Sequence, residues 1–178
     1  MEQPYRDAAV RLGRLLAENG IRLVYGGGRI GLMGLCADAA LAAGGQVTGV
    51  IPNHLHDVEV GHTGLTELIV TDDMHSRKAK MFELSDAFAI LPGGLGTLDE
   101  TLEILTWRQL GLHDKPVLIV NVGGYWAPLM DLLGHVVAKG FASPSVAGLF
   151  QVVESVDAVI RAIREAPEER LSGRTELI

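Results

Sequence analysis

Residues 92–100, PGGLGTLDE, combine two kinds of chemistry in one short segment. Three glycines follow the apolar run DAFAIL, so the backbone can approach a ligand closely, and the amides at a helix N-terminus favour negative charge. Glu100 then places a carboxylate one helical turn further on. Because this acid would repel a bound phosphate, it would have to face another part of the ligand, such as a sugar.

The same segment also has a purely structural explanation. Thr97 followed three residues later by Glu100 is the pattern of a capping box, in which each side chain bonds a backbone amide of a new helix. Glycines by themselves account for a tight turn. From these residues alone, an inert turn and an anion-binding loop both remain open.

A second candidate segment is MHSRKAKM, residues 74–81. Met74, Arg77, Lys78 and Met81 recur at helical spacing, so two cations and two thioethers share one helix face. A solvated basic face is the ordinary explanation. The flanking methionines favour a half-buried face, which suits cations that meet an anionic ligand with an apolar part.

The segment GGGRIG, residues 26–31, matches G-x-G-x-x-G after an apolar run. A dinucleotide site also requires an acid at the end of the following strand, where the sequence instead has VIPN, and the nearest acid is Asp57. The match is therefore weak support for NAD. Neither glycine-rich stretch contains Gly-Lys-Ser/Thr, which excludes a Walker A loop.

Histidines and acids crowd the polar connection at residues 53–65, namely His54, His56, Asp57, Glu59 and His62. Such side chains can hold zinc, but no helical H-x-x-x-H pattern fixes them here. We expect a solvated loop that closes over a ligand, with neither a metal nor a cofactor.

Alternating apolar periods predict the elements that position these segments. The predicted strands are 21–25, 46–51, 66–71, 86–91, 116–122 and 148–153, and the predicted helices are 4–19, 31–43, 73–84, 97–110, 126–137 and one capped by Ser155. Strands of nearly continuous Val, Ile and Leu separated by helices imply a doubly wound, Rossmann-like parallel sheet in a three-layer α/β/α fold. Such sheets bind ligands beyond the carboxyl ends of their strands, where both glycine-rich stretches fall.

Composition narrows the class of protein further. The 178 residues fit one domain, 1–166, followed by a polar tail, 167–178. A net charge of −7 argues against a nucleic-acid partner, and no apolar stretch is long enough for a membrane span. The single cysteine, Cys36, lies in an apolar helical segment and excludes an intrachain disulfide, which fits inert core packing in the cytoplasm.

Taken together, these segments resemble the Lonely Guy family, the cytokinin riboside 5′-monophosphate phosphoribohydrolases. The resemblance extends to about residue 155, and the segments that carry it are YGGGRIGLMG, VTGVIP, MHSRKAKM, PGGLGTLDE and TWRQLGLHDKP. Many relatives are labelled lysine decarboxylases, but no lysine setting typical of pyridoxal phosphate is visible in this sequence. The resemblance implies hydrolysis of a nucleotide N-glycosidic bond, releasing an adenine-type base and ribose 5-phosphate.

The family's catalytic residues correspond here to Arg77 and Glu100. Its substrate-binding residues correspond to Glu59, Lys78, Gly93, Gly94, Gly96, Thr97, Leu98, Asp99 and Thr106, and we add Arg77 itself, Met74, Leu95, Gly27 and Gly28 from the same motifs. Many relatives carry Glu where this chain has Asp99. Family members are dimers with sites near the subunit interface, so we expect a homodimer or a higher homo-oligomer.

The resemblance also implies one difference. Relatives begin with an additional strand and a Gly-Ser-rich turn before the helix matched here by residues 4–19, so we expect such a strand upstream of Met1, absent from this sequence.

Cleavage of an N-glycosidic bond builds positive charge on the ribose, which an ionised Glu100 would stabilise. Arg77 would hold the substrate rather than donate a proton, because an arginine side chain keeps its proton in proteins. Two alternatives remain: a nucleosidase for purine or pyrimidine nucleotides in general, and a non-catalytic carrier of a nucleotide or of the molybdenum cofactor. The sequence does not distinguish a prenylated base from a plain one.

Overall fold

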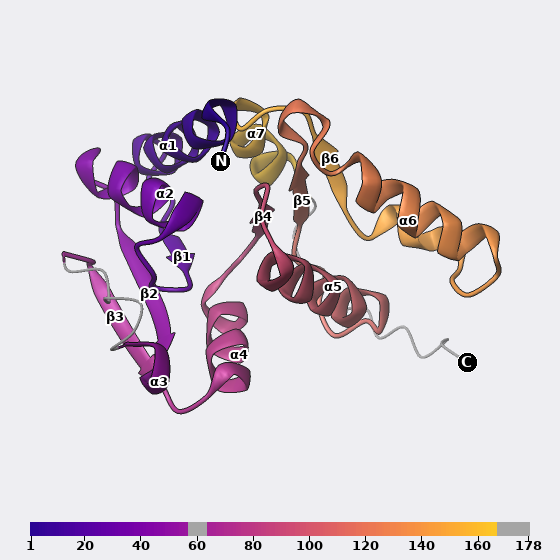
Figure 1. Ribbon diagram of the computed structural model, residues 1–178, viewed down its shortest axis with the longest axis horizontal. Coiled ribbons are helices and arrows are strands. Elements are labelled where there is room, and N and C mark those ends of the chain that lie inside the picture. The colour runs from indigo at the N-terminus through magenta and orange to yellow at the C-terminus, as the bar shows by residue number, and fades with distance from the viewer. Residues whose placement is uncertain (57–63, 167–178) are drawn as a thin grey trace. The chain divides into compact units, whose positions relative to one another are not determined.

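The computed structural model describes residues 1–56 and 64–166. By its internal contacts the chain forms two compact units, Met1–Ser85 and Asp86–Ile178. Each unit contains a three-stranded parallel sheet among its described residues, with the strands joined by helices (Figure 1). The parallel α/β class predicted from the sequence is confirmed, and the prediction of one domain over 1–166 stays a prediction.

The first unit has its strands in the order β1-β2-β3. Its elements are α1 (Gln3–Glu18), β1 (Leu23–Tyr25), α2 (Gly31–Ala42), β2 (Val47–Pro52), α3 (Asn53–His56), β3 (Glu67–Thr71) and α4 (Met74–Leu84). The short helix α3 falls in the connection that we expected to be irregular.

Both faces of the first sheet are covered. On one face, Tyr25 and Val47 pack against Ala37 and Ala40 of α2. Thr48 points to the opposite face because side chains alternate along a strand, and it is only 1% exposed. Helix α4 contacts all three strands, and we infer that it covers this second face.

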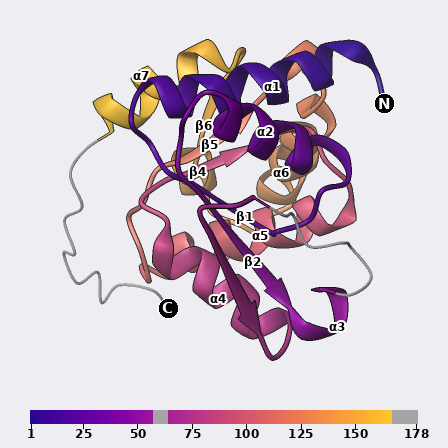
Figure 2. The same ribbon diagram turned by 90° about the vertical axis from the view of Figure 1, so that its left-hand side faces the viewer.

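Helices α1 and α2 lie side by side (Figure 2). Their approach depends on Gly13, where a Cβ would stand 2.1 Å from the carbonyl oxygen of Cys36. Cys36 is buried, and burial raises the pKa of its thiol to about 12. The thiol is therefore unreactive at neutral pH, as expected for a core residue.

The second unit has its strands in the order β4-β5-β6. Its elements are β4 (Phe88–Ile90), α5 (Leu95–Gln109), β5 (Val117–Val120), the 3-10 turn η1 (Val122–Gly124), α6 (Ala127–Ala138), the 3-10 turn η2 (Pro144–Gly148), β6 (Gln151–Val153) and α7 (Asp157–Glu165). The expected cap at Ser155 is wrong, because the N-cap residue of α7 is Val156, which provides no side-chain hydrogen bond.

An apolar cluster joins the second sheet to α5 and α6. Its buried members are Ile90, Leu105, Val117, Ile119, Trp126 and Leu129. Strand β5 is buried along its whole length, and α7 also contacts it. Among the described residues, no helix is long and apolar enough to cross a membrane.

His113 links the end of α5 to the start of β5. Its Nδ1 accepts a hydrogen bond from the Lys115 amide at 3.1 Å, so Nε2 carries the proton and donates to the Ile104 carbonyl at 3.0 Å. The ring is 2% exposed and meets Phe88 edge-on. Burial lowers the pKa of His113 below its ordinary value of 6.5, which keeps the imidazole neutral.

This histidine predicts a specific dependence of stability on pH. In the unfolded chain the imidazole takes up a proton near pH 6.5, whereas in the folded chain it does so only at lower pH. The free energy of unfolding should therefore fall as the pH drops from about 6.5 to the folded pKa, by at most about 1.4 kcal/mol per pH unit from this group. Urea unfolding between pH 7.5 and 5 would measure the slope.

A pair of variants isolates the effect. His113→Gln should be less stable at every pH and should lose this part of the slope. His135→Gln is the control, because this histidine of α6 is exposed. That variant should keep the wild-type slope. An unchanged slope in His113→Gln would contradict the assignment.

Candidate functional site

Helix α4 starts directly after β3, at the carboxyl edge of the first sheet. Asp73 is its N-cap, and its carboxylate accepts a hydrogen bond from the Ser76 amide at 2.7 Å. That bond lowers the pKa of Asp73, so the cap stays ionised at neutral pH. The cap fixes the first turn of α4, which carries Met74 and Arg77, beside the ends of β1 and β2.

Arg77 is buried, whereas His75 and Ser76 before it are exposed and Lys78 after it is half-buried. It is 7% exposed, and its Nε donates to the Val50 carbonyl at 3.2 Å while Nη2 donates to the Gly26 carbonyl at 3.0 Å. A third nitrogen, Nη1, lies 3.7 Å from the sulfur of Met74. A solvated basic face is therefore the wrong explanation for Arg77. The side chain instead ties α4 to the carboxyl ends of two strands.

Among the described residues, no carboxylate pairs with the positive charge of Arg77. The three hydrogen bonds go to two neutral carbonyls and a thioether. Burying a charge is costly unless an opposite charge or polar groups balance it. The carbonyl dipoles supply part of that balance, and an anionic ligand would supply more.

The first glycine stretch is shaped by this arginine. A Cβ on Gly26 would lie 1.9 Å from Nη2 of Arg77, so a side chain there would displace the guanidinium. Gly27 has a φ of +75° and its Cβ would approach that of Ile51 at 3.2 Å. Two of the three glycines at 26–28 are thus explained within the fold, and the third, Gly28, is also buried.

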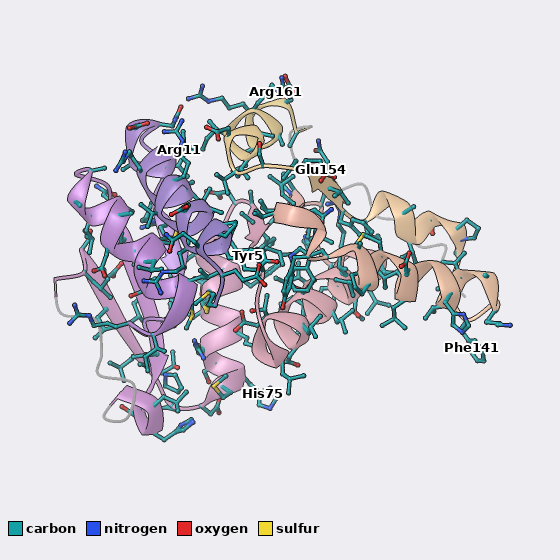
Figure 3. All side chains as sticks on the ribbon, turned by 45° about the horizontal axis from the view of Figure 1, so that its top comes forward. Tyr5, Arg11, His75, Phe141, Glu154 and Arg161 are labelled. Carbon is teal, nitrogen blue, oxygen red and sulfur yellow. The ribbon has the colours of Figure 1, made fainter. Side chains whose placement is uncertain are left out.

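The other candidate residues of the first unit are less enclosed. Met74, Lys78 and Met81 are half-buried, and Lys78 interacts with other residues of the chain. His75 is exposed on the outer face of α4 (Figure 3). Glu59, Asp57 and His62 lie outside the described residues, and across the described chain no three His, Cys, Asp or Glu side chains cluster as metal ligands would.

In the second unit, the glycine loop runs from the end of β4 into α5. The helix begins at Leu95 with Gly94 as its N-cap, and its first hydrogen bond joins the Leu98 amide to the Gly94 carbonyl at 3.1 Å. Thr97 is therefore the third helical residue rather than the N-cap, and the capping-box explanation is wrong. The amides of residues 95–97 precede the first helical hydrogen bond and remain available to an anion.

The glycines of this loop have different environments. A Cβ on Gly93 would lie 2.1 Å from Oγ1 of Thr97, because the threonine side chain folds back over the loop. At Gly94 and Gly96 a Cβ would meet nothing within 4 Å. The space above these two residues is open, as a ligand-binding surface requires.

Glu100 lies one turn along α5 from Gly96. Residues four apart share a helix face, so Glu100 and Gly96 are neighbours on the same surface. Glu100 is half-buried and interacts within the chain, whereas Asp99 is exposed. Gly96 contributes no side chain to the helix face that it shares with Glu100, and a Cβ there would meet open space.

Two further predicted residues of α5 have other surroundings. Leu98 packs against the apolar cluster of the second unit, so its side chain serves the core. Thr106 is exposed and donates its hydroxyl to the Leu102 carbonyl at 2.7 Å. Eleven residues separate it from Leu95, which is roughly 16 Å along the helix. Thr106 and the loop amides of one chain therefore cannot bind the same phosphate.

One contact of the glycine loop was not anticipated from the sequence. The hydroxyl of Tyr125, in the turn after β5, donates to the Gly93 carbonyl at 2.7 Å. The only sequence signal was the segment GGYW at residues 123–126, directly after a predicted strand. Within each unit, then, the structure brings together Arg77, Met74 and Gly26, and separately the 93–100 segment and Tyr125.

Comparison with known proteins identifies the family. The family model described as "Possible lysine decarboxylase" matches residues 33–163. A cytokinin riboside 5′-monophosphate phosphoribohydrolase from Rhodococcoides fascians is 48% identical over 161 residues, which cover 90% of this chain and 81% of that protein. The phosphoribohydrolase LOG1 from Arabidopsis thaliana is 45% identical over 161 residues, which cover 90% and 76% of the two chains.

Solved structures show the same fold. The protein TM1055 has a TM-score of 0.68 at 27% identity, covering 90% of this chain and 87% of that one. The molybdenum cofactor carrier protein of Chlamydomonas reinhardtii has a TM-score of 0.69 at 22% identity, covering 93% and 89%. At that identity the carrier supports the fold alone. The family model and the identity to these phosphoribohydrolases show that the chain belongs to the Lonely Guy family, whose model carries the lysine decarboxylase description.

Proposed function

We propose that the protein hydrolyses the N-glycosidic bond of an adenosine-type 5′-monophosphate of the cytokinin class. Water adds to C1′ of the ribose, the bond from C1′ to the base nitrogen breaks, and the proton of water passes to the departing base. The products are the free base and ribose 5-phosphate. The observation that carries this proposal is the set of relatives, 43–52% identical, that are named cytokinin riboside 5′-monophosphate phosphoribohydrolases.

The geometry of the glycine loop supports the phosphate end of this proposal. The amides of Leu95, Gly96 and Thr97 start a helix of 15 residues, and the dipole of such a helix favours an anion at its N-terminus. Gly93, Gly94 and Gly96 add no side chain in front of these amides. In this proposal the loop binds the 5′-phosphate, and phosphate binding positions the sugar for reaction.

Glu100 is the proposed catalytic carboxylate. As the C1′ bond breaks, positive charge develops on the ribose, and an ionised carboxylate nearby lowers the barrier. Glu100 also has the chemistry to orient the attacking water. Asp99, one residue earlier, points to a different side of the helix, because adjacent residues are about 100° apart.

Arg77 is the proposed cationic partner. Its guanidinium is fixed by two backbone carbonyls and has no carboxylate partner in the described part of the chain. It would offset the negative charge of the substrate rather than transfer a proton. Lys78 and Met74 adjoin it on α4, and Gly27 and Gly28 adjoin the carbonyl it binds. Thr106 and the undescribed Glu59 complete the proposed substrate-binding set.

We also propose a cytoplasmic homodimer. Support for a dimer comes from large apolar side chains left exposed in the second unit. These include Leu112 at 63% and Phe141 at 87%, of which Phe141 is labelled in Figure 3. Where such side chains form a contiguous apolar patch, that patch is typical of a surface covered by a partner.

The substrate panel that tests the function contains isopentenyladenosine monophosphate, AMP, CMP and the matching ribosides. We expect release of free base from the isopentenyl monophosphate, slower release from AMP, and none from ribosides, because these lack the phosphate that the loop binds. Chromatography of the bases measures the outcome. Equal turnover of all monophosphates would indicate a general nucleosidase, and binding without turnover would contradict the enzymatic proposal.

The Glu100→Gln variant tests the carboxylate. The amide has nearly the same shape but no charge, so kcat should fall by about 10²- to 10³-fold, the range for loss of one electrostatic stabiliser. The KM for the monophosphate should change little. As a control, Asp131→Asn removes an exposed carboxylate of α6 in the same unit and should retain the wild-type activity. A Glu100→Gln enzyme with wild-type kcat would refute this role.

A glycine pair tests whether the open space above the loop holds the substrate. A Cβ at Gly96 meets no protein atom within 4 Å, so Gly96→Ala should leave the fold intact and raise its stability slightly. The methyl group would nevertheless intrude on a bound phosphate and raise KM by at least tenfold. Gly134 of α6 is the matched control, since its Cβ also meets open space.

Gly134→Ala should have the same small effect on thermal unfolding and no effect on KM. If both variants keep the wild-type KM, the substrate does not occupy the surface at Gly96.

A further inference from the structure

We propose that Tyr125 is a positioning residue that orients the peptide between Gly93 and Gly94 for the substrate phosphate. This inference rests on the proposed function of the glycine loop. The observation behind it is the 2.7 Å hydrogen bond from the Tyr125 hydroxyl to the Gly93 carbonyl, between residues 32 positions apart.

The hydrogen bond fixes the direction of one amide. The described residues contain no cis peptide bond, so the carbonyl of Gly93 and the N–H of Gly94 lie in one trans peptide plane and point in opposite directions. Holding the carbonyl on Tyr125 therefore aims the Gly94 N–H away from the tyrosine. This N–H directly precedes the amides of residues 95–97 and adds a donor to the same anion-binding surface.

Two adjacent glycines would not hold this orientation by themselves. Glycine has more accessible backbone conformations than any other residue, so the Gly93–Gly94 peptide loses more entropy on ordering. The Thr97 side chain blocks one side of Gly93, where a Cβ would be 2.1 Å from Oγ1. Tyr125 restrains the peptide through the Gly93 carbonyl, to which Thr97 donates no hydrogen bond in the described part of the chain.

The tyrosine is itself held in place by its turn. Gly123 and Gly124 have φ values of +61° and +76°, which lets the chain reverse directly after β5. The side-chain oxygen of Asn121 accepts a hydrogen bond from the Trp126 amide at 2.9 Å, and its nitrogen donates to Glu154 at 3.3 Å. The turn is thus fastened to the end of β6.

The aromatic ring of Tyr125 is anchored as well. It meets Trp126 edge-on with ring centroids 4.9 Å apart, and Trp126 is buried in the apolar cluster at 3% exposure. The hydroxyl therefore extends from a fixed ring toward the glycine loop. A tyrosine used only for packing would not require this hydroxyl contact, so removal of the hydroxyl separates the two roles.

Two substitutions at this position make the test. Tyr125→Phe keeps the ring on Trp126 and loses the hydroxyl, whereas Tyr125→Leu loses both. We expect Tyr125→Phe to weaken the binding of ribose 5-phosphate and inorganic phosphate on the order of tenfold, with Tyr125→Leu at least as weak. The KM for the monophosphate should rise in parallel, while kcat falls less. Calorimetric titration of the two phosphates measures binding without turnover.

A substitution at Ser143 provides the control, because Ser143→Ala also removes one hydroxyl from the second unit. It caps η2, which precedes β6 and so lies at the amino end of the sheet, away from the loop. Ser143→Ala should leave phosphate affinity unchanged. Wild-type phosphate affinity in Tyr125→Phe, with loss only in Tyr125→Leu, would assign Tyr125 to packing and overturn the proposal.

The outcomes also separate this proposal from the proposed function. If the wild-type protein binds ribose 5-phosphate with the expected dependence on Tyr125 but hydrolyses no monophosphate, the positioning role stands and the enzymatic function fails. If it hydrolyses monophosphates and Tyr125→Phe binds phosphate normally, the function stands and the positioning role fails. A protein that does neither overturns both.

Discussion

Both candidate segments depend on one kind of interaction, a hydrogen bond from a side chain of one element to a backbone carbonyl of another. In the first unit, Arg77 of α4 holds the Gly26 carbonyl at the end of β1. In the second unit, Tyr125 holds the Gly93 carbonyl after β4. Parallel sheets place such carbonyls at one edge, where the strands end and hydrogen bonding within the sheet stops. Glycine allows the chain to turn there, and a side chain from a neighbouring element then decides which way the peptide faces.

This arrangement explains why these positions carry glycine. At Gly26 the space that a side chain would fill is occupied by the guanidinium, and at Gly93 it is occupied by Thr97. At Gly94 and Gly96 the same space is empty. The first pair therefore serves the fold and the second pair leaves room for a ligand. A glycine-rich motif thus contains two physical roles that the one-letter sequence does not separate.

Much of the fold was predictable because near-continuous apolar strands and amphipathic helices have distinct periods. Each predicted strand is present, although all of them except β2 are shorter than predicted. The first turn of α5 was missed because Thr97 and Glu100 imitate a capping box, whereas the helix starts two residues earlier at an open N-terminus. The burial of Arg77 was not predictable from local pattern, since its partners lie 27 and 51 residues away. Tyr125 was missed for the same reason.

The apolar cluster of the second unit has a consequence for how the glycine loop moves. Leu98 anchors the start of α5 in that cluster, and Trp126, the neighbour of Tyr125, is one of its buried members. Both supports of the loop therefore rest on the same packed side chains. The loop amides have no helical hydrogen bonds, but their peptide planes could reorient only if this packing loosened. The loop is expected to keep one geometry up to the temperature at which its sheet melts, rather than soften as an independent segment.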